Sequence, residues 1–128
     1  MHSFCFSSSK LSESKPHGAS FLAEAALGIV ILGDSEKSDV WVEDCSIASI
    51  LVQLTAQSLG LGTCWIQIRN RSYNKDVTSE EYIQAFLKIP DHIKVESIIA
   101  FGYPTEERSG VTKEELDYSK IRKDVYFS

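Results

Sequence analysis

A long apolar helix that ends at two glycines constrains this chain more than any other feature. Residues 40–59 carry apolar side chains around much of a helix, and Gly60-Leu61-Gly62 leads directly into the strand-like segment 63–68. A helix that is apolar on several sides is normally packed by a sheet and by a second partner. Glycines at such a junction let the backbone approach closely either a neighbouring strand or a flat ligand. The pattern alone favours the packing joint and leaves the ligand site open.

The segments around this junction predict alternating strands and helices. The apolar run 27–32 favours a strand buried on both faces, and residues 94–103 predict a further strand. Residues 80–87 predict a short amphipathic helix, and the alternation of Phe4 and Phe6 indicates a short first strand. This order predicts one domain over residues 1–128, of mixed α/β or α+β class, with an irregular N-terminus over residues 1–20.

Capping residues predict where the two helices begin and end. Ser38 or Asp39 can cap the first helix, and Gly60 fits the position just beyond its C-terminus. Ser79 or Thr78 can cap the second helix.

Composition excludes several classes of function. A net charge of −5 argues against nucleic-acid binding, which normally shows a basic surface. Charged and amide side chains interrupt the apolar run 40–59, so the sequence predicts no membrane span, and the N-terminus does not resemble a signal peptide. Cys5, Cys45 and Cys64 are odd in number and widely spaced, which indicates no disulfide framework, no zinc site and a reducing cytoplasm.

The sequence contains no recognisable hydrolytic or phosphate-loop motif. His17 and His92 lie in turn-like contexts typical of surface histidines, and Cys45 and Cys64 are expected to be buried, small apolar residues. The strand after the glycines is left as the candidate site. An exposed backbone edge at Gln67 and Ile68 could offer N–H groups to a planar heterocycle such as a flavin.

The tail from residue 105 is charged and then closes with Val125-Tyr126-Phe127. These residues predict a detached terminal strand. Terminal strands stay ordered only when something holds them, so the tail either pairs with a second subunit or frays.

Three stretches together resemble the C-terminal part of the nitroreductase family of FMN-dependent flavoproteins. They are Leu27-Gly-Ile-Val-Ile-Leu-Gly-Asp34, the segment from Trp41 through Leu59-Gly-Leu-Gly-Thr-Cys-Trp-Ile66, and the segment from Ile89-Pro-Asp-His-Ile93 through Gly102-Tyr-Pro104. They occur in the family's order and cover about 80 residues at similar separations.

The resemblance implies an α+β fold with a mixed β-sheet flanked by helices, and a homodimer with FMN at the subunit interface. It places the flavin against the backbone N–H groups of Ile66, Gln67 and Ile68, beside Trp65, and it places Arg108 and Lys113 near the FMN phosphate. The implied activity is electron transfer from NAD(P)H to a nitroaromatic, a quinone or a similar small acceptor. No side chain is required as a general acid or base, and the terminal segment over residues 105–128 is expected to cross to the partner subunit.

The sequence departs from the family pattern at its N-terminus. The arginine-bearing helical segment that grips the FMN phosphate and the Asn-x-Gln-Pro-Trp-like motif have no counterpart here, so the chain is expected to be N-terminally shortened. The alternative is therefore a non-catalytic, cofactor-free remnant of the same fold that acts as a dimeric binding or interaction protein. A small α/β domain unrelated to flavins is a third reading.

Overall fold

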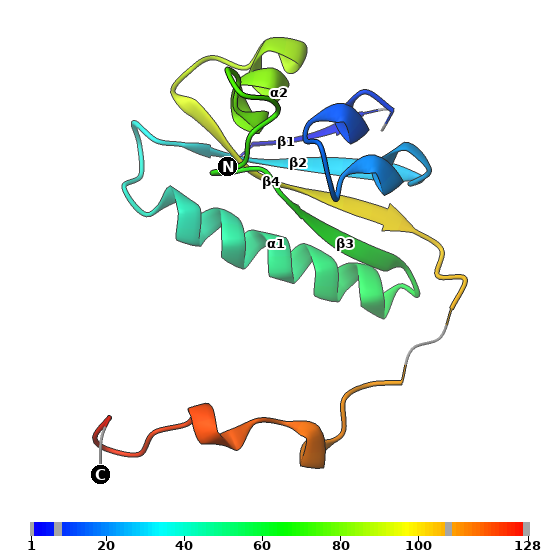
Figure 1. Cartoon of the computed structure of the whole chain (residues 1–128), viewed down its shortest axis with the longest axis vertical. Helices are drawn as coiled ribbons and strands as arrows, with labels where there is room; N and C mark the ends of the chain where they lie inside the picture. The colour runs from blue at the N-terminus through cyan, green and yellow to red at the C-terminus, as the bar shows by residue number, and fades with distance from the viewer. Residues whose placement is uncertain (1, 7–8, 107–108, 127–128) are drawn as a thin grey trace.

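A four-stranded sheet with helices on both faces forms the body of the protein (Figure 1). The computed structural model describes residues 2–6, 9–106 and 109–126, and the side chains of residues 9–106 and 109–126. In chain order the strands and α-helices are β1 (His2–Phe6), β2 (Leu27–Asp34), α1 (Trp41–Ser58), β3 (Gly62–Gln67), α2 (Ser79–Leu87) and β4 (Ile93–Gly102). The sequence predicted each of these six elements to within a few residues, and the α+β class is confirmed.

The strand order is β1-β2-β4-β3, and each of the three pairings between the described strands is antiparallel. The most apolar strands, β2 and β4, occupy the centre, which explains why both read as nearly continuous apolar runs. β3 lies at one edge of the sheet. Its outer side, turned away from β4, is called the open edge of β3 below.

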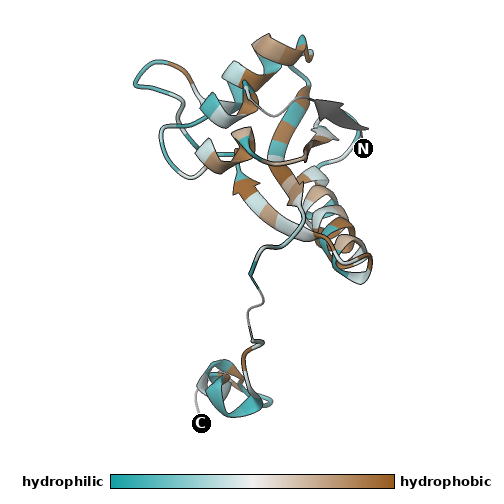
Figure 2. Ribbon diagram, turned by 90° about the vertical axis from the view of Figure 1, so that its right-hand side faces the viewer, coloured by the Kyte–Doolittle hydropathy of each residue, from teal (hydrophilic) through white to brown (hydrophobic). Residues whose placement is uncertain are grey.

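Helix α1 covers one face of the sheet, and α2 covers the other together with two short 3-10 helices, Leu11–Glu13 and Ser20–Ala23 (Figure 1). Each face has its own apolar core. The larger core, on the α2 side, includes Val30, Ile66, Ile83 and Ile98, and the smaller core, on the α1 side, includes Ile31, Cys45, Ile99 and Phe101. Figure 2 shows the hydrophobic colouring concentrated in the central strands and in α1.

The C-terminal end of α1 forms as the sequence predicts. Gly60 has φ +76°, its N–H donates to the carbonyl of Gln57, and the N–H of Leu61 donates to the carbonyl of Ala56. This is the Schellman arrangement, in which a left-handed residue satisfies the last carbonyls of a helix. Gly60 therefore ends the helix, and its left-handed conformation explains the glycine, since a Cβ atom there would meet nothing within 4 Å.

The N-terminal end of α1 differs from the sequence expectation. Val40 occupies the capping position and no side chain caps the helix, so the prediction of Ser38 or Asp39 as the cap is wrong. The Ser38 hydroxyl instead donates to the Asp44 carboxylate at 3.1 Å. The N–H groups of turn residues 36–38 donate to the backbone carbonyl or the carboxylate of Asp34, and this turn displaces the helix start by one residue.

Helix α2 begins at a complete capping box. The Thr78 hydroxyl accepts from the N–H of Glu81, and the Glu81 carboxylate accepts from the N–H of Thr78 at 2.7 Å. Thr78, rather than Ser79, therefore caps α2.

The tail forms no strand over its described residues. Residues 105–106 and 109–126 contain two short 3-10 helices, Lys113–Glu115 and Tyr118–Lys120, so the expectation of a strand at Val125 and Tyr126 is not met in the single chain. Phe127 lies outside the described residues. Figures 1 and 2 show the tail standing apart from the sheet, where no second strand is available to pair with it.

Candidate functional site

The open edge of β3 presents backbone groups that no described strand uses. In an antiparallel ladder, consecutive residues turn their N–H and C=O groups alternately toward the partner strand and away from it. The N–H of Ile68 donates to the Glu96 carbonyl at 3.3 Å, so Ile68 faces β4. By this alternation Ile66 also faces β4, whereas Trp65 and Gln67 turn their backbone groups to the open edge.

The four predicted strand residues therefore divide into two pairs. Ile66 and Ile68 are fully buried on the α2 side and anchor the strand in the larger core. Trp65 packs on the α1 side, where its indole N–H donates to the Gln67 side-chain oxygen at 3.0 Å. The Gln67 amide in turn donates to the carbonyl of Arg69 at 3.0 Å. These bonds hold the end of β3 rigid, and Gln67 is the residue placed best to offer an N–H at the open edge.

Lys15 lies at this edge, and Arg71 is close enough to act on its charge; the sequence predicted neither residue as part of the site. The Lys15 ammonium donates to the Gln67 carbonyl at 3.2 Å across 52 residues of sequence. Partial burial, followed by the positive charge of Arg71, lowers the pKa of Lys15 below its ordinary value, while Cys64 has the opposite effect. Neither Lys15 nor Arg71 takes part in any ion pair formed by the described residues. No local motif marks either residue. Lys15 reaches β3 across 52 residues of sequence, whereas Arg71 follows soon after the strand ends at Gln67.

Of the two predicted phosphate ligands, Lys113 and Arg108, the structure describes only Lys113. Arg108 lies outside the described residues. Lys113 is exposed and begins a 3-10 helix of the tail, and Figure 1 shows that the tail stands apart from the sheet. Their role in phosphate binding stays a prediction.

Both described cysteines carry free thiols, but their surroundings differ. Cys45 is buried against the sheet, as expected. Cys64 is exposed on β3, so the expectation that it is buried is wrong. The reason is that β3 is an edge strand, on which side chains near the strand end reach solvent.

A buried acid lies beneath the N-terminal part of α1. Glu96 is 4% exposed, and its Oε2 atom has no hydrogen-bond partner among the described residues. It occupies a bulge in β4, because Ile31 pairs with Ser97 and Leu32 pairs with Val95, which leaves Glu96 between them. Burial raises the pKa of the Glu96 carboxyl, and this outweighs the opposing effects of the Arg69 charge and the nearby Gln67 side chain.

Replacing Glu96 by glutamine is expected to stabilise the fold at neutral pH. A carboxyl whose pKa is higher in the folded state favours folding below its unfolded pKa, and that contribution is lost as the pH rises through the folded pKa. Glu96→Gln should therefore raise the free energy of unfolding by about 1 kcal/mol at pH 7, with a smaller difference at pH 4. Urea unfolding at both pH values measures this change in the free energy of unfolding. The exposed Glu24→Gln is the control, and equal effects of the two variants would contradict the assignment.

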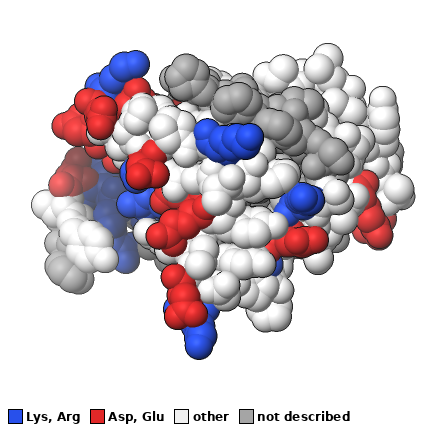
Figure 3. Space-filling model, turned by 90° about the horizontal axis from the view of Figure 1, so that it is seen from above, with Lys and Arg blue, Asp and Glu red and all other residues white. Residues whose placement is uncertain are grey.

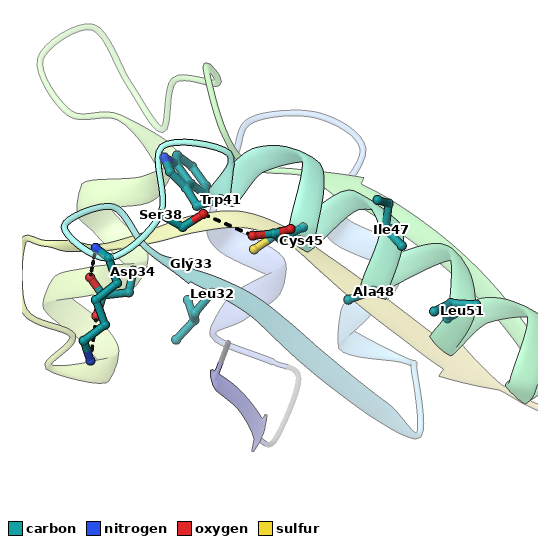
Figure 4. A pocket seen from close by; sticks show the side chains of 11 residues that line it. Leu32, Gly33, Asp34, Ser38, Trp41, Cys45, Ile47, Ala48 and Leu51 are labelled. Atoms are coloured by element: carbon teal, nitrogen blue, oxygen red, sulfur yellow. Dashed lines mark hydrogen bonds and ion pairs between the residues drawn. The ribbon is translucent and has the colours of Figure 1, made fainter.

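An apolar hollow of about 440 Å³ lies between β2 and the N-terminal half of α1 (Figure 4). Its walls are largely apolar and come from Leu32, Trp41, Cys45, Ile47, Ala48 and Leu51. At its rim, Asp34 pairs with Lys37 at 3.2 Å. A second hollow of about 360 Å³ lies further along the same helix, and Leu51 borders both. Both hollows open beside α1, away from the open edge of β3.

Surface charge, candidate metal ligands and helix length are further features of the described residues. Seen from above, basic side chains are scattered among acidic and uncharged ones and form no continuous basic surface on this face (Figure 3). Among the described residues, no group of His, Cys, Asp and Glu side chains could hold a metal ion. Within the same residues, no helix has the length and apolar character needed to cross a membrane.

Comparison with known proteins identifies relatives of this fold. Residues 5–103 match the family model described as the nitroreductase family. A protein of Archaeoglobus fulgidus is 34% identical over 103 residues, and one of Methanothermobacter thermautotrophicus is 37% identical over 100 residues; both carry a name for NADH dehydrogenase/NAD(P)H nitroreductase activity. The matches cover 77% and 76% of this chain but only 56% and 49% of the relatives, so the chain spans about half the length of these two proteins.

Solved structures show the same similarity in three dimensions. A structure from Clostridium difficile R20291 described as an FMN-dependent nitroreductase superposes with a TM-score of 0.94 at 41% identity, covering 98% of this chain and 75% of that one. A structure from Bacteroides thetaiotaomicron, also named for NADH dehydrogenase/NAD(P)H nitroreductase activity, has a TM-score of 0.85 at 27% identity and covers 98% and 72%. The family-model match over residues 5–103 and the two relatives above 30% identity show that the chain belongs to the nitroreductase family.

Proposed function

We propose that this protein is an FMN-dependent oxidoreductase that binds the flavin along the open edge of β3. The observation that carries the proposal is the outward-facing backbone of Gln67, flanked by two basic side chains that have no acidic partner among the described residues. A flavin ring is planar and rich in hydrogen-bond acceptors, and FMN is anionic. An edge that offers an N–H donor and positive charge fits such a group.

Each residue at this edge has a distinct proposed task. The Gln67 N–H donates to the flavin ring, and the bonds from Trp65 to Gln67 and from Gln67 to Arg69 hold that donor in place. Ile66 and Ile68 fix the strand from the core side. When bound, FMN supplies two-electron transfer between NAD(P)H and a small acceptor such as a nitroaromatic or a quinone. No side chain of this edge is needed as a general acid or base.

We further propose that two copies associate through the outer surface of α1. This helix turns small residues, Cys45, Ser49 and Ala56, toward the sheet and large ones toward solvent. Ile47, Leu51 and Leu54 are 60%, 58% and 55% exposed, and their spacing places them on one side of the helix. A contiguous apolar surface of this kind typically marks a protein interface.

The C-terminal tail, from residue 105, also agrees with the proposed dimer. Its described part exposes apolar side chains, among them Leu116, Ile121 and Tyr126, and packs against neither face of its own sheet. We propose that it crosses to the partner subunit, where its apolar residues become covered. We place the protein in the cytoplasm, where thiols such as Cys45 and Cys64 stay reduced.

A comparison of two substitutions at Gln67 tests the FMN site. Gln67→Pro removes the outward N–H, whereas Gln67→Ala keeps the N–H and removes only the side chain. Proline is tolerated on an edge strand where its missing N–H would have faced outward, so β3 should still form. We expect FMN to bind the wild-type protein, and Gln67→Pro to bind it about tenfold more weakly than Gln67→Ala. Quenching of flavin fluorescence on titration gives both affinities.

The outcomes of this titration are distinct. Equal affinities for the two variants would show that the flavin does not use the Gln67 N–H. A wild-type protein that binds no FMN would instead support the cofactor-free binding protein as the function of this chain. Circular dichroism of both variants checks that the fold is intact.

A further inference from the structure

The Lys15 ammonium occupies a position that no other described lysine shares. It is bonded to the Gln67 carbonyl at 3.2 Å, and both backbone groups of Gln67 face the open edge. The positive charge therefore lies next to the N–H that is proposed to contact the ligand. Lys37 and Lys120, in contrast, pair with Asp34 and Asp117 at the surface.

The turn after Lys15 holds this side chain in place. Gly18 has φ +76°, which lets the Lys15-Pro16-His17-Gly18 turn fold back on itself. A methyl group built on Gly18 would lie 3.6 Å from Cε and 3.7 Å from Nζ of Lys15, so the turn packs along the end of the side chain. The residue is partly buried rather than freely solvated, and its position is defined.

Holding the charged Lys15 side chain at this partly buried position costs free energy unless a negative charge lies nearby. Burial disfavours the charged form of Lys15, and the neighbouring Arg71 guanidinium disfavours it further. No described carboxylate lies in ion-pair contact with either residue. A cationic pair of this kind gains most from a ligand that brings negative charge to the same edge.

We propose that Lys15, supported by Arg71, places positive charge beside the ligand atom that accepts from the Gln67 N–H, and that this charge makes bound FMN easier to reduce. The inference rests on the proposed FMN site and adds the residue that sets the flavin's reduction potential. Reduction adds electrons to the ring, so a fixed positive charge at its edge stabilises the reduced form more than the oxidised form. Lys15 thus acts on the electronic state of the ligand, beyond a general contribution to binding.

Replacing Lys15 separates this role from a structural one. In Lys15→Met the apolar stem is kept and the charge is removed, whereas Lys15→Arg keeps the charge. We expect the ratio of affinities for reduced and oxidised FMN to fall about tenfold in Lys15→Met, which for a two-electron couple lowers the reduction potential by about 30 mV. Lys15→Arg should restore most of the potential. Arg71→Met should shift it in the same direction by a smaller amount.

The measurement is the potential of the FMN-loaded protein, equilibrated anaerobically with a reference dye, together with the affinity for oxidised FMN. Lys10→Met removes a charge elsewhere on the surface and is the matched control. A Lys15→Met potential equal to that of the control, with FMN still bound, would overturn this inference and leave the proposed function standing. A wild-type chain that binds no FMN would overturn both. If Lys15→Met does not fold, Lys15→Gln and Arg71→Met decide in the same way.

Discussion

Replacing Leu54 by glutamate is expected to convert a dimer of this protein into monomers at micromolar concentration. Leu54 lies on the apolar side of α1, in its C-terminal half, and is 55% exposed in the single chain. In a two-fold symmetric interface each substitution acts twice, because the same residue is present on both copies. Burying a leucine side chain contributes about 1.5–3 kcal/mol, so two copies account for about 3 kcal/mol or more, which weakens association by about a hundredfold or more.

Sedimentation over a range of protein concentrations measures this effect. Glutamate is a good helix former and position 54 is already half exposed, so α1 itself should remain intact. Ala85→Glu adds the same charge to an exposed position of α2, on the opposite face of the sheet, and is the matched control. A wild-type protein that stays monomeric, or a Leu54→Glu variant that dimerises as tightly as the control, would contradict the proposed interface.

Replacing Gly33 by valine is expected to destabilise the fold by about 3 kcal/mol. Gly33 lies on β2 directly beneath the start of α1. A Cβ atom at this position would lie 2.7 Å from Cε3 and 3.1 Å from Cβ of Trp41, and 3.2 Å from the Cys45 sulfur. Since the obstructing atoms belong to an indole ring and a buried thiol, the helix must shift away from the sheet. The same shift would open the hollow that Figure 4 shows between β2 and α1.

Urea unfolding at fixed protein concentration gives the free energy of this change. Gly102→Val is the control, because Gly102 also lies in the last two residues of its strand but a Cβ there meets no atom within 4 Å. We expect the control to remain within about 0.5 kcal/mol of the wild type. If the clash with Trp41 causes the loss of stability, Trp41→Ala should lower the free energy of unfolding less in the Gly33→Val background than in the wild type. Additive effects of the two substitutions would contradict this explanation.

Local sequence signals predicted the elements of the fold well. The Thr78 capping box, the left-handed Gly60 and the apolar runs of β2 and β4 act over a few residues, so they can be read without tertiary information. The start of α1 was missed for the opposite reason. Ser38 and Asp39 are both good capping residues, yet the turn that folds back onto Asp34 gives Ser38 a different partner.

The candidate site was only partly predictable. The strand carrying Gln67 followed from the glycine junction and from the resemblance to nitroreductases. Which of its N–H groups faces outward depends on the register with β4, and a single residue of shift would exchange Gln67 for Ile68. Lys15 left no signal in the sequence, because 52 residues separate it from the carbonyl that it contacts.

The sequence by itself determined that this chain forms an α+β domain with a helix that ends at Gly60 and a strand that follows it. The periodicity of apolar residues and the chemistry of caps are local, and they suffice for that conclusion. Only the tertiary structure decided that Gly60 is a structural joint and that the candidate binding surface lies at the open edge beyond it. That surface exists because β3 is the last strand of its sheet and because the fold brings Lys15 into contact with the Gln67 carbonyl. Both are consequences of packing between distant segments.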